Sequence, residues 1–177
     1  KAKQKSDTWN LIVISGTMGL GKSCLAHKMA IGLSKLNNAK FDLSTNMTYL
    51  REELRTMIDG SDDKKTGQLP EYSVILVDEL VSLFFNRNFH NTEQIAMLEL
   101  LNKCRDRHLT LIGCVPEFHS LDKALLYLVD FWVHIESRSN AYVFKRDSNP
   151  FAKDSWNINA NHKLWVTKRI RNSVNYV

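Results

Sequence analysis

The chain has 177 residues, of which 44% are hydrophobic and 24% are charged, which suits one globular domain with a substantial core. No apolar run reaches the roughly 18–20 residues of a membrane-spanning helix and no signal-peptide pattern opens the chain, so we expect a cytoplasmic protein, in the host cytoplasm if the source is viral. The three cysteines lack CxxC spacing, which argues against a disulfide framework or a zinc site.

The net charge of +5 is unevenly distributed along the chain. Residues 1–136 hold 16 Lys/Arg against 17 Asp/Glu, whereas residues 137–177 hold eight against two. The basic C-terminal part is consistent with contact to a phosphate backbone, with contact to an acidic partner, or with a solvated face. We expect residues 1–8 to form a flexible leader and residues 9–177 a single domain with a basic extension from about residue 137.

Hydrophobic periodicity and turn residues divide the chain into alternating strands and helices. In chain order the prediction is a buried strand over 9–15, a helix over about 22–36, a weaker strand over 40–47, a helix over about 49–58, an exposed loop over 59–71, a buried strand over 72–80, an irregular aromatic stretch over 80–90, a helix from residue 91 ending in RDRH, and strands over 109–115, 130–136 and 141–146, with a short helix over 120–129. This alternation predicts an α/β fold, with a mainly parallel sheet sandwiched between helices and antiparallel strands at the C-terminal edge.

The stretch GTMGLGKS at residues 16–23 matches the pattern G-x-x-x-x-G-K-[ST]. Glycines let the backbone approach phosphate oxygens, Lys22 would reach the β- and γ-phosphates, and the Ser23 hydroxyl would bind Mg²⁺. A buried strand before the motif and an amphipathic helix after it favour a P-loop over a simple glycine turn. The predicted ATP-binding residues are Gly16, Thr17, Met18, Gly19, Leu20, Gly21, Lys22, Ser23 and Cys24.

Two acidic residues end the predicted strand over 72–80. Asp78 would hold the Mg²⁺ together with Ser23, and Glu79 stands one residue further, where a carboxylate can deprotonate an attacking water. Solvated strand-end acids are the alternative. A water-activating base favours hydrolysis over kinase chemistry, and the base-reading N-K-x-D of GTPases is absent. The sequence therefore predicts a P-loop ATPase of the additional-strand, catalytic-glutamate class, with the run over 109–115 as the additional strand.

Residues 78–135 resemble the FtsK/HerA superfamily of DNA-translocating ATPases, which includes viral packaging ATPases and zonula-occludens-toxin-like phage assembly proteins. The resemblance rests on the acidic strand and on NKCRDRHLTLIGCVPEFHSLDKALLYLVDFWVHI, and FDLSTNM looks similar too. It implies a homo-oligomeric ring that translocates or packages DNA. Where those families carry a T-Q sensor this chain reads CVPEFH, so Glu117 and His119 are the sensor candidates.

The resemblance to ring ATPases also implies an arginine finger that reaches a neighbouring γ-phosphate. Arg105 and Arg107 are the main candidates, with Arg87 and Arg138 as rivals; favourable charge at a helix C-terminus is the alternative role. For His119, His134 and the tryptophans Trp132, Trp156 and Trp165 we favour structural roles.

Two other functions stay open at this stage. GKSCLAHKMAIGL resembles the loader-type AAA+ ATPases, which act as switches that remodel a protein partner. Against that interpretation, no helical lid is predicted after the last strand. A nucleotide kinase is the third possibility, although DGSDDKKTGQ is a poor phosphate lid.

Overall fold

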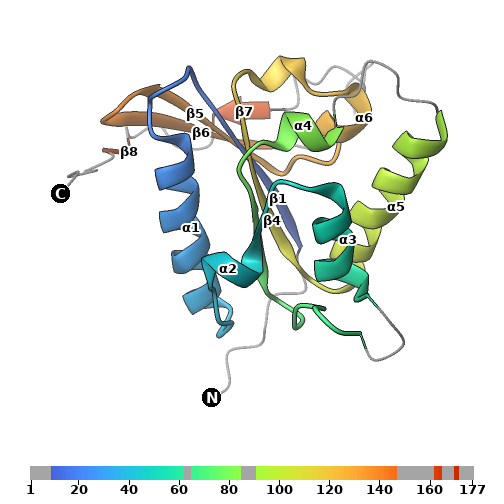
Figure 1. Cartoon of the computed structure of the whole chain (residues 1–177). Coiled ribbons are helices and arrows are strands. Elements are labelled where there is room, and N and C mark those ends of the chain that lie inside the picture. The colour runs from blue at the N-terminus through green and yellow to red at the C-terminus, as the bar shows by residue number, and fades with distance from the viewer. Residues whose placement is uncertain (1–8, 62–64, 85–90, 147–161, 165–169, 172–177) are drawn as a thin grey trace.

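The structure, a computed structural model, describes residues 9–61, 65–84, 91–146, 162–164 and 170–171 (Figure 1). The helices are α1 (Lys22–Leu36), α2 (Leu43–Asn46), α3 (Arg51–Asp59), α4 (Leu80–Phe84), α5 (Asn91–Asp106), the 3-10 turn η1 (Phe118–Ser120) and α6 (Lys123–Leu126). The strands are β1 (Asn10–Ser15), β2 (Met47–Thr48), β3 (Val74–Val77), β4 (Thr110–Val115), β5 (Phe131–Ser137), β6 (Asn140–Arg146), β7 (His162–Leu164) and β8 (Ile170–Arg171).

Within the described ranges the strands form one sheet in the order β2-β3-β4-β1-β5-β6-β7, with β8 also paired to β6. The pairs from β2 to β5 are parallel, while β6 runs antiparallel to β5, β7 and β8. The prediction of a mainly parallel sheet with antiparallel strands at its C-terminal edge is confirmed. β4 lies between β1 and β3, as predicted for the additional strand.

Two hydrophobic clusters pack on the two faces of this sheet. Leu11 and Val13 of β1 contribute to the cluster that contains residues of α3 and α5, whereas Ile12 and Ile14 contribute to the cluster that contains residues of α1. Figure 1 shows α1 on one side of the sheet and α3 and α5 on the other. Because both faces of β1 and β4 are covered, these strands read as continuous apolar runs rather than as alternating ones.

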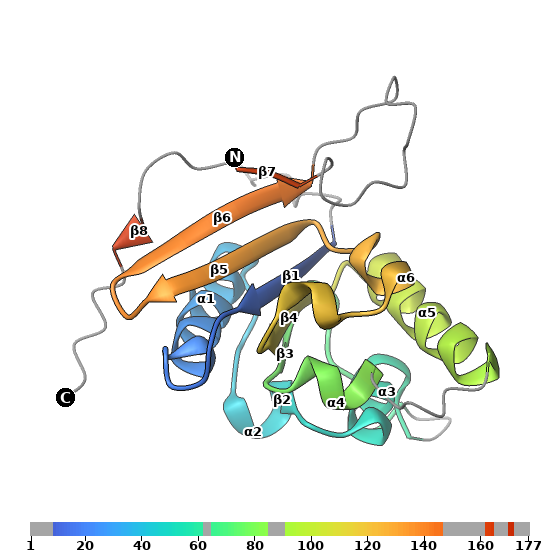
Figure 2. The ribbon, with the colours of Figure 1, turned by 90° about the horizontal axis from the view of Figure 1, so that it is seen from above.

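The β5–β6 hairpin extends the sheet beyond the part covered by α5 (Figure 2). Its strands alternate between buried and less buried positions, as expected when one face is more open than the other. The prediction that the run over 141–146 pairs with β5 through a turn at residues 137–140 is therefore confirmed. None of the helices in the described part of the chain combines the length and apolarity needed to cross a bilayer.

Two predicted elements were wrong. The expected strand over residues 40–47 is largely the short helix α2, because the Asp42 carboxylate accepts hydrogen bonds from the Ser44 N–H and hydroxyl at 2.9 and 2.8 Å; strand pairing begins only at Met47. The stretch from Leu80, expected to be irregular, starts with helix α4. Leu80 and Leu83 are buried in the core. Their spacing of three residues places both on one face of a helix, a pattern that the neighbouring aromatic residues made hard to recognise in the sequence.

Candidate active site

The carboxyl ends of the parallel strands meet at one edge of the sheet. Ser15, the last residue of β1, pairs with Val115 of β4, and Val77 of β3 pairs with Gly113. The residues that follow these strands are Gly16, Asp78 and Pro116, so the fold places the P-loop and the acidic pair at a common edge. This edge lies at the top of Figure 1 and faces the viewer in Figure 2. In open α/β sheets ligands bind in the crevice outside this edge.

Gly16 fixes the start of the P-loop against two strands. Its N–H donates to the Pro116 carbonyl at 3.2 Å. Its φ is 152°, and a Cβ at this position would lie only 2.8 Å from the Ile135 carbonyl oxygen. Only glycine fits between β4 and β5 here, because any side chain would force one of the strands away.

The P-loop ends by starting α1. Gly21 has a φ of 86° and immediately precedes the helix, whose first hydrogen bond runs from the Leu25 N–H to the Gly21 carbonyl at 3.0 Å. The first N–H groups of an α-helix have no partner within the helix and carry a partial positive charge. Lys22, Ser23 and Cys24 supply these groups, which gives the site a built-in anion cradle.

Lys22 points back into the loop. Its ammonium donates to the Gly16 carbonyl at 2.7 Å and to the Thr17 carbonyl at 3.0 Å. These contacts hold the positive charge inside the loop rather than in bulk solvent. Ser23 is exposed on the first turn of α1, and the Met18 side chain is 95% exposed.

One carboxylate oxygen of Asp78 lacks a hydrogen-bond partner within the described ranges. Its Oδ1 is buried and makes no hydrogen bond to the described residues, an arrangement that is costly unless a ligand completes it. The pKa of the neighbouring Cys114 thiol is raised to about 12, mainly by burial; the Asp78 charge and a side-chain hydrogen bond with Asp78 act in the same direction, and the Lys22 charge acts in the opposite one. The opposite charges of Lys22 and Asp78 therefore both lie near Cys114 of β4.

Glu79 and the two sensor candidates also lie at this edge. Glu79 is exposed between β3 and α4, Glu117 is exposed directly before η1, and His119 is exposed within η1. The structure thus brings the P-loop, both acids of the β3 end and the β4 tip together, while the roles of these side chains stay predictions.

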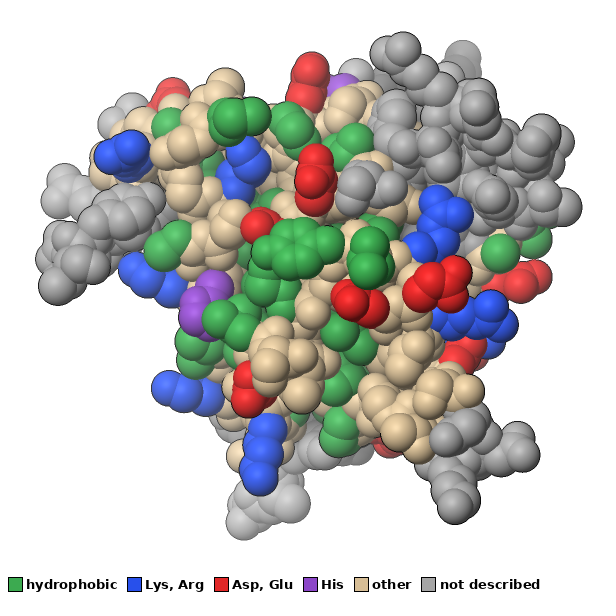
Figure 3. All heavy atoms as spheres, in the orientation of Figure 1, with side chains coloured by type: hydrophobic (Ala, Val, Ile, Leu, Met, Phe, Trp, Pro, Cys, Tyr) green, Lys and Arg blue, Asp and Glu red, His purple; other side chains and the backbone are tan. Residues whose placement is uncertain are grey.

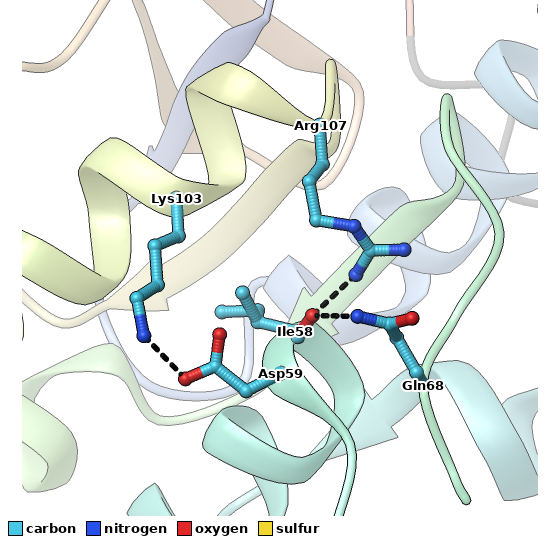
Figure 4. Close-up of polar contacts among 5 residues, drawn as sticks. All are labelled: Ile58, Asp59, Gln68, Lys103 and Arg107. Carbon is cyan, nitrogen blue, oxygen red and sulfur yellow. Dashed lines mark hydrogen bonds and ion pairs between the residues drawn. The ribbon is translucent and has the colours of Figure 1, made fainter. Parts of the chain in front are cut away.

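Arg105 and Arg107 lie elsewhere. Both precede β4 and sit at the amino edge of the sheet, opposite the P-loop of the same chain. The half-buried Arg107 guanidinium donates to the carbonyls of Ile58 and Leu69, so it links the end of α3 to the segment before β3. Figure 4 shows the contact with Ile58. Arg105 is exposed. Of the rivals, Arg138 is exposed in the β5–β6 turn, and Arg87 lies outside the described residues.

Sequence reasoning missed Ser15, and with it the link between the P-loop and β5. The Ser15 hydroxyl is buried and contacts Trp132 Nε1 at 2.7 Å and His134 Nδ1 at 3.0 Å. The available signal was a single hydroxyl at the end of the apolar run LIVIS, since a buried polar group needs a partner. The structural roles favoured for Trp132 and His134 agree with these contacts.

Solved structures with a similar fold include viral ATPases. The DNA-packaging ATPase B204 from Sulfolobus Turreted Icosahedral Virus is 14% identical, with 91% of this chain and 99% of that chain covered and a TM-score of 0.54. The genome packaging NTPase B204 from Sulfolobus turreted icosahedral virus 2 in complex with AMP is 12% identical, with 90% and 98% covered and a TM-score of 0.56. The N-terminal domain of zonular occludens toxin from Neisseria meningitidis is 16% identical, with 89% and 94% covered and a TM-score of 0.48.

At these identities the first two likenesses establish a shared fold. Curated protein sequences give no match. The sequence profile of the ATPase family associated with various cellular activities (AAA) matches residues 12–138. This span begins in β1, contains the P-loop and both acids after β3, and ends in the β5–β6 turn. The chain therefore belongs to the ATPase family associated with various cellular activities (AAA), and it is a P-loop enzyme that binds and hydrolyses ATP.

Proposed function

We propose that this chain hydrolyses Mg²⁺-bound ATP at the carboxyl edge of its sheet and uses the energy to translocate or package double-stranded DNA, as a ring of identical copies. The ATPase part follows from the family and the P-loop fold. Four parts of the proposal go beyond the family: the metal, the roles of individual residues, the ring and the DNA. Each of them has its own support.

The residues at the carboxyl edge have the chemistry needed to bind Mg²⁺ and a nucleoside triphosphate. Mg²⁺ in such sites takes one or two protein oxygens and completes its shell with phosphate oxygens and water. Asp78 Oδ1, which has no hydrogen-bond partner among the residues described, and the exposed Ser23 hydroxyl have this chemistry. When bound, the metal neutralises charge that develops on the phosphates. Lys22 and the first turn of α1 would hold the β- and γ-phosphates.

Glu79 is the proposed general base. It follows Asp78 directly, and its exposed position between β3 and α4 leaves it accessible to a water at the γ-phosphate. The carboxylate accepts a proton from that water as the water attacks. Glu117 and His119 at the tip of β4 are the proposed sensors of the γ-phosphate.

The antiparallel strands that follow β5 favour a packaging motor over a partner-remodelling switch. Beyond Leu126 the described residues form strands β5 to β8 and no helix, so they contain nothing like the helical lid of a loader-type switch. The B204 packaging ATPases match this chain over nearly their whole length and over its own, which supports the same kind of load.

The distribution of charge favours the C-terminal part as the DNA-binding region. Figure 3 shows acidic and apolar side chains toward the middle of the face that carries α3 and α4, with most Lys and Arg nearer the margins. Glu52 and Glu53 of α3 are among the exposed acids, and such a face repels a phosphate backbone. Residues 137–177 have eight basic and two acidic residues, and Lys145 on β6 is exposed.

A ring would bring an arginine of one copy to the ATP of the next. Arg105 is the better candidate of the predicted pair, because Arg107 would first have to leave two carbonyls. Arg138 stays an alternative because it lies at the carboxyl edge. A finger acting between copies makes the ATPase rate per chain depend on protein concentration.

The test is the ATPase rate measured against protein concentration, with and without double-stranded DNA of several lengths. We expect the rate per chain to rise with concentration, and DNA to stimulate it in a way that weakens steeply as salt increases. Lys145→Gln should reduce the DNA stimulation, whereas the matched control Lys35→Gln, an exposed lysine on α1, should not. A constant rate per chain and no response to any DNA length would exclude the motor and leave the switch.

A further inference from the structure

Trp132 lies at the centre of an aromatic stack on β5. Its ring is nearly parallel to Phe118 at a centroid distance of 4.3 Å and to Phe144 at 4.5 Å, with interplanar angles of 9° and 21°. His119 and His134 approach it edge-on at 5.7 and 5.9 Å. Offset-parallel and edge-on contacts at these distances are favourable geometries for aromatic rings, so the orientation of the indole is fixed from several sides.

The fixed indole points its single donor at the root of the P-loop. Trp132 Nε1 donates to Ser15 Oγ at 2.7 Å, and His134 Nδ1 contacts the same oxygen at 3.0 Å. Ser15 is 1% exposed and directly precedes Gly16. Without Trp132 the buried hydroxyl would lose a partner, which changes where the end of β1 is most stable.

The same indole also contacts the tip of β4. Phe118 follows Glu117 at the start of η1 and is 2% exposed. The Pro116 carbonyl just before it accepts the Gly16 N–H at 3.2 Å. Trp132 therefore contacts both segments that this backbone hydrogen bond joins, one through its N–H and the other through its ring face.

We propose that Trp132 is a positioning residue of the ATPase, which holds the root of the P-loop and the tip of β4 in one fixed relation. Through Ser15 it sets where Gly16 and hence the Lys22 loop begin, and through Phe118 it sets where Glu117 and His119 stand. The proposal rests on the ATPase activity of the family but not on the DNA load. If DNA does not stimulate the enzyme, the role of Trp132 still stands, and if Trp132 has no such role, the proposed DNA motor still stands.

The decisive variants remove the hydrogen bond and keep the aromatic stack. Trp132→Phe keeps a ring between Phe118 and Phe144 but has no N–H, and Ser15→Ala removes the acceptor. We expect each to lower kcat/KM for ATP about tenfold, the size of one net hydrogen bond. The double variant should lose no more than Ser15→Ala alone, about tenfold rather than a hundredfold, because Ser15→Ala already removes the acceptor of the Trp132 N–H together with the contact to His134.

Tyr142→Phe is the matched control. Tyr142 pairs with His134 across the strands, and its hydroxyl donates to Glu136 Oε2 at 3.1 Å. This variant therefore also loses one aromatic donor on β5–β6, but that donor bonds Glu136 and not Ser15. Its kcat/KM should equal that of the wild type. Unfolding midpoints without nucleotide identify the folded protein in every sample.

Three results would overturn the proposal: unchanged kcat/KM in folded Trp132→Phe or folded Ser15→Ala, a hundredfold loss in the double variant, or an equal loss in Tyr142→Phe. If Trp132→Phe does not fold, Ser15→Ala against Tyr142→Phe decides alone, since a tenfold loss confined to Ser15→Ala supports the link and an unchanged rate rejects it.

Discussion

The two edges of the same parallel strands differ in how their polar groups are used. At the amino edge the groups satisfy one another: Arg107 donates to the Ile58 and Leu69 carbonyls, Gln68 donates to Ile58 as well, and Lys103 pairs with Asp59. At the carboxyl edge, in the part of the chain that the structure describes, Asp78 Oδ1 is buried without a hydrogen-bond partner, and the Lys22 ammonium donates to two carbonyls of the P-loop itself.

This difference suggests that the amino edge contributes to stability and the carboxyl edge to ATP turnover. Polar groups that are already paired add to the free energy of folding and leave little for a ligand. A buried oxygen without a partner costs stability and is retained where a ligand completes it. We therefore expect substitutions at the carboxyl edge to change ATP turnover at nearly constant stability, and substitutions at the amino edge to change stability at nearly constant turnover.

Lys22→Ala is expected to lower activity strongly. Removal of a charge that stabilises the phosphates should lower kcat/KM by about 10²–10³, while the unfolding midpoint changes little because the described contacts of the ammonium are to two loop carbonyls. Lys28→Ala, an exposed lysine further along α1, is the control and should keep wild-type kinetics. Equal kinetics for the two variants would contradict the P-loop assignment.

Arg107→Ala is expected to act in the opposite way. It leaves the Ile58 and Leu69 carbonyls with one donor fewer, which should lower the free energy of unfolding by about 1–3 kcal/mol; denaturant titration measures this. Turnover per folded molecule should stay unchanged. A loss of turnover at unchanged stability would instead assign Arg107 as the arginine finger, and Arg105→Ala, at an exposed position, is the comparison variant.

The smallest expected effect at the amino edge is that of Lys103→Ala. The Lys103 ammonium lies 2.6 Å from Asp59 Oδ2, but the Lys103 side chain is 52% exposed and that of Asp59 is 28% exposed. Exposed ion pairs contribute about 0.2–1 kcal/mol and are screened by salt. In denaturant titrations the difference in the free energy of unfolding between wild type and variant should therefore shrink as salt is raised. A difference above that range at high salt would show that the pair is not screened.

Sequence reasoning succeeded where local pattern and global fold agree. The P-loop follows a buried strand and starts a helix, so the positions of Gly16 and Lys22 could be predicted from spacing alone. The placement of β4 between β1 and β3 came from the ATPase class. The first prediction depends on short-range rules that tertiary packing does not overturn, and the second depends on the resemblance to a known class of ATPase.

Several contacts that sequence reasoning could not supply join residues distant in sequence. Ser15 meets Trp132 and His134 across more than a hundred residues, and no local pattern encodes that pairing. The carbonyl partners of Arg107 lie 49 and 38 residues away, so its place at a helix end did not indicate them; its role as an arginine finger stays a prediction. The α2 turn was missed because the Asp42 cap outweighed a weak strand pattern.

The most direct test of the account is the nucleotide that Glu79→Gln retains. Glutamine keeps the shape of the side chain but cannot accept the proton, so turnover should fall by about 10²–10⁴ while ATP still binds. Glu71→Gln, an exposed acid at the amino edge, should turn over ATP like the wild type. After removal of free nucleotide, we predict intact ATP bound to Glu79→Gln; ADP formed at the wild-type rate would contradict hydrolysis by Glu79.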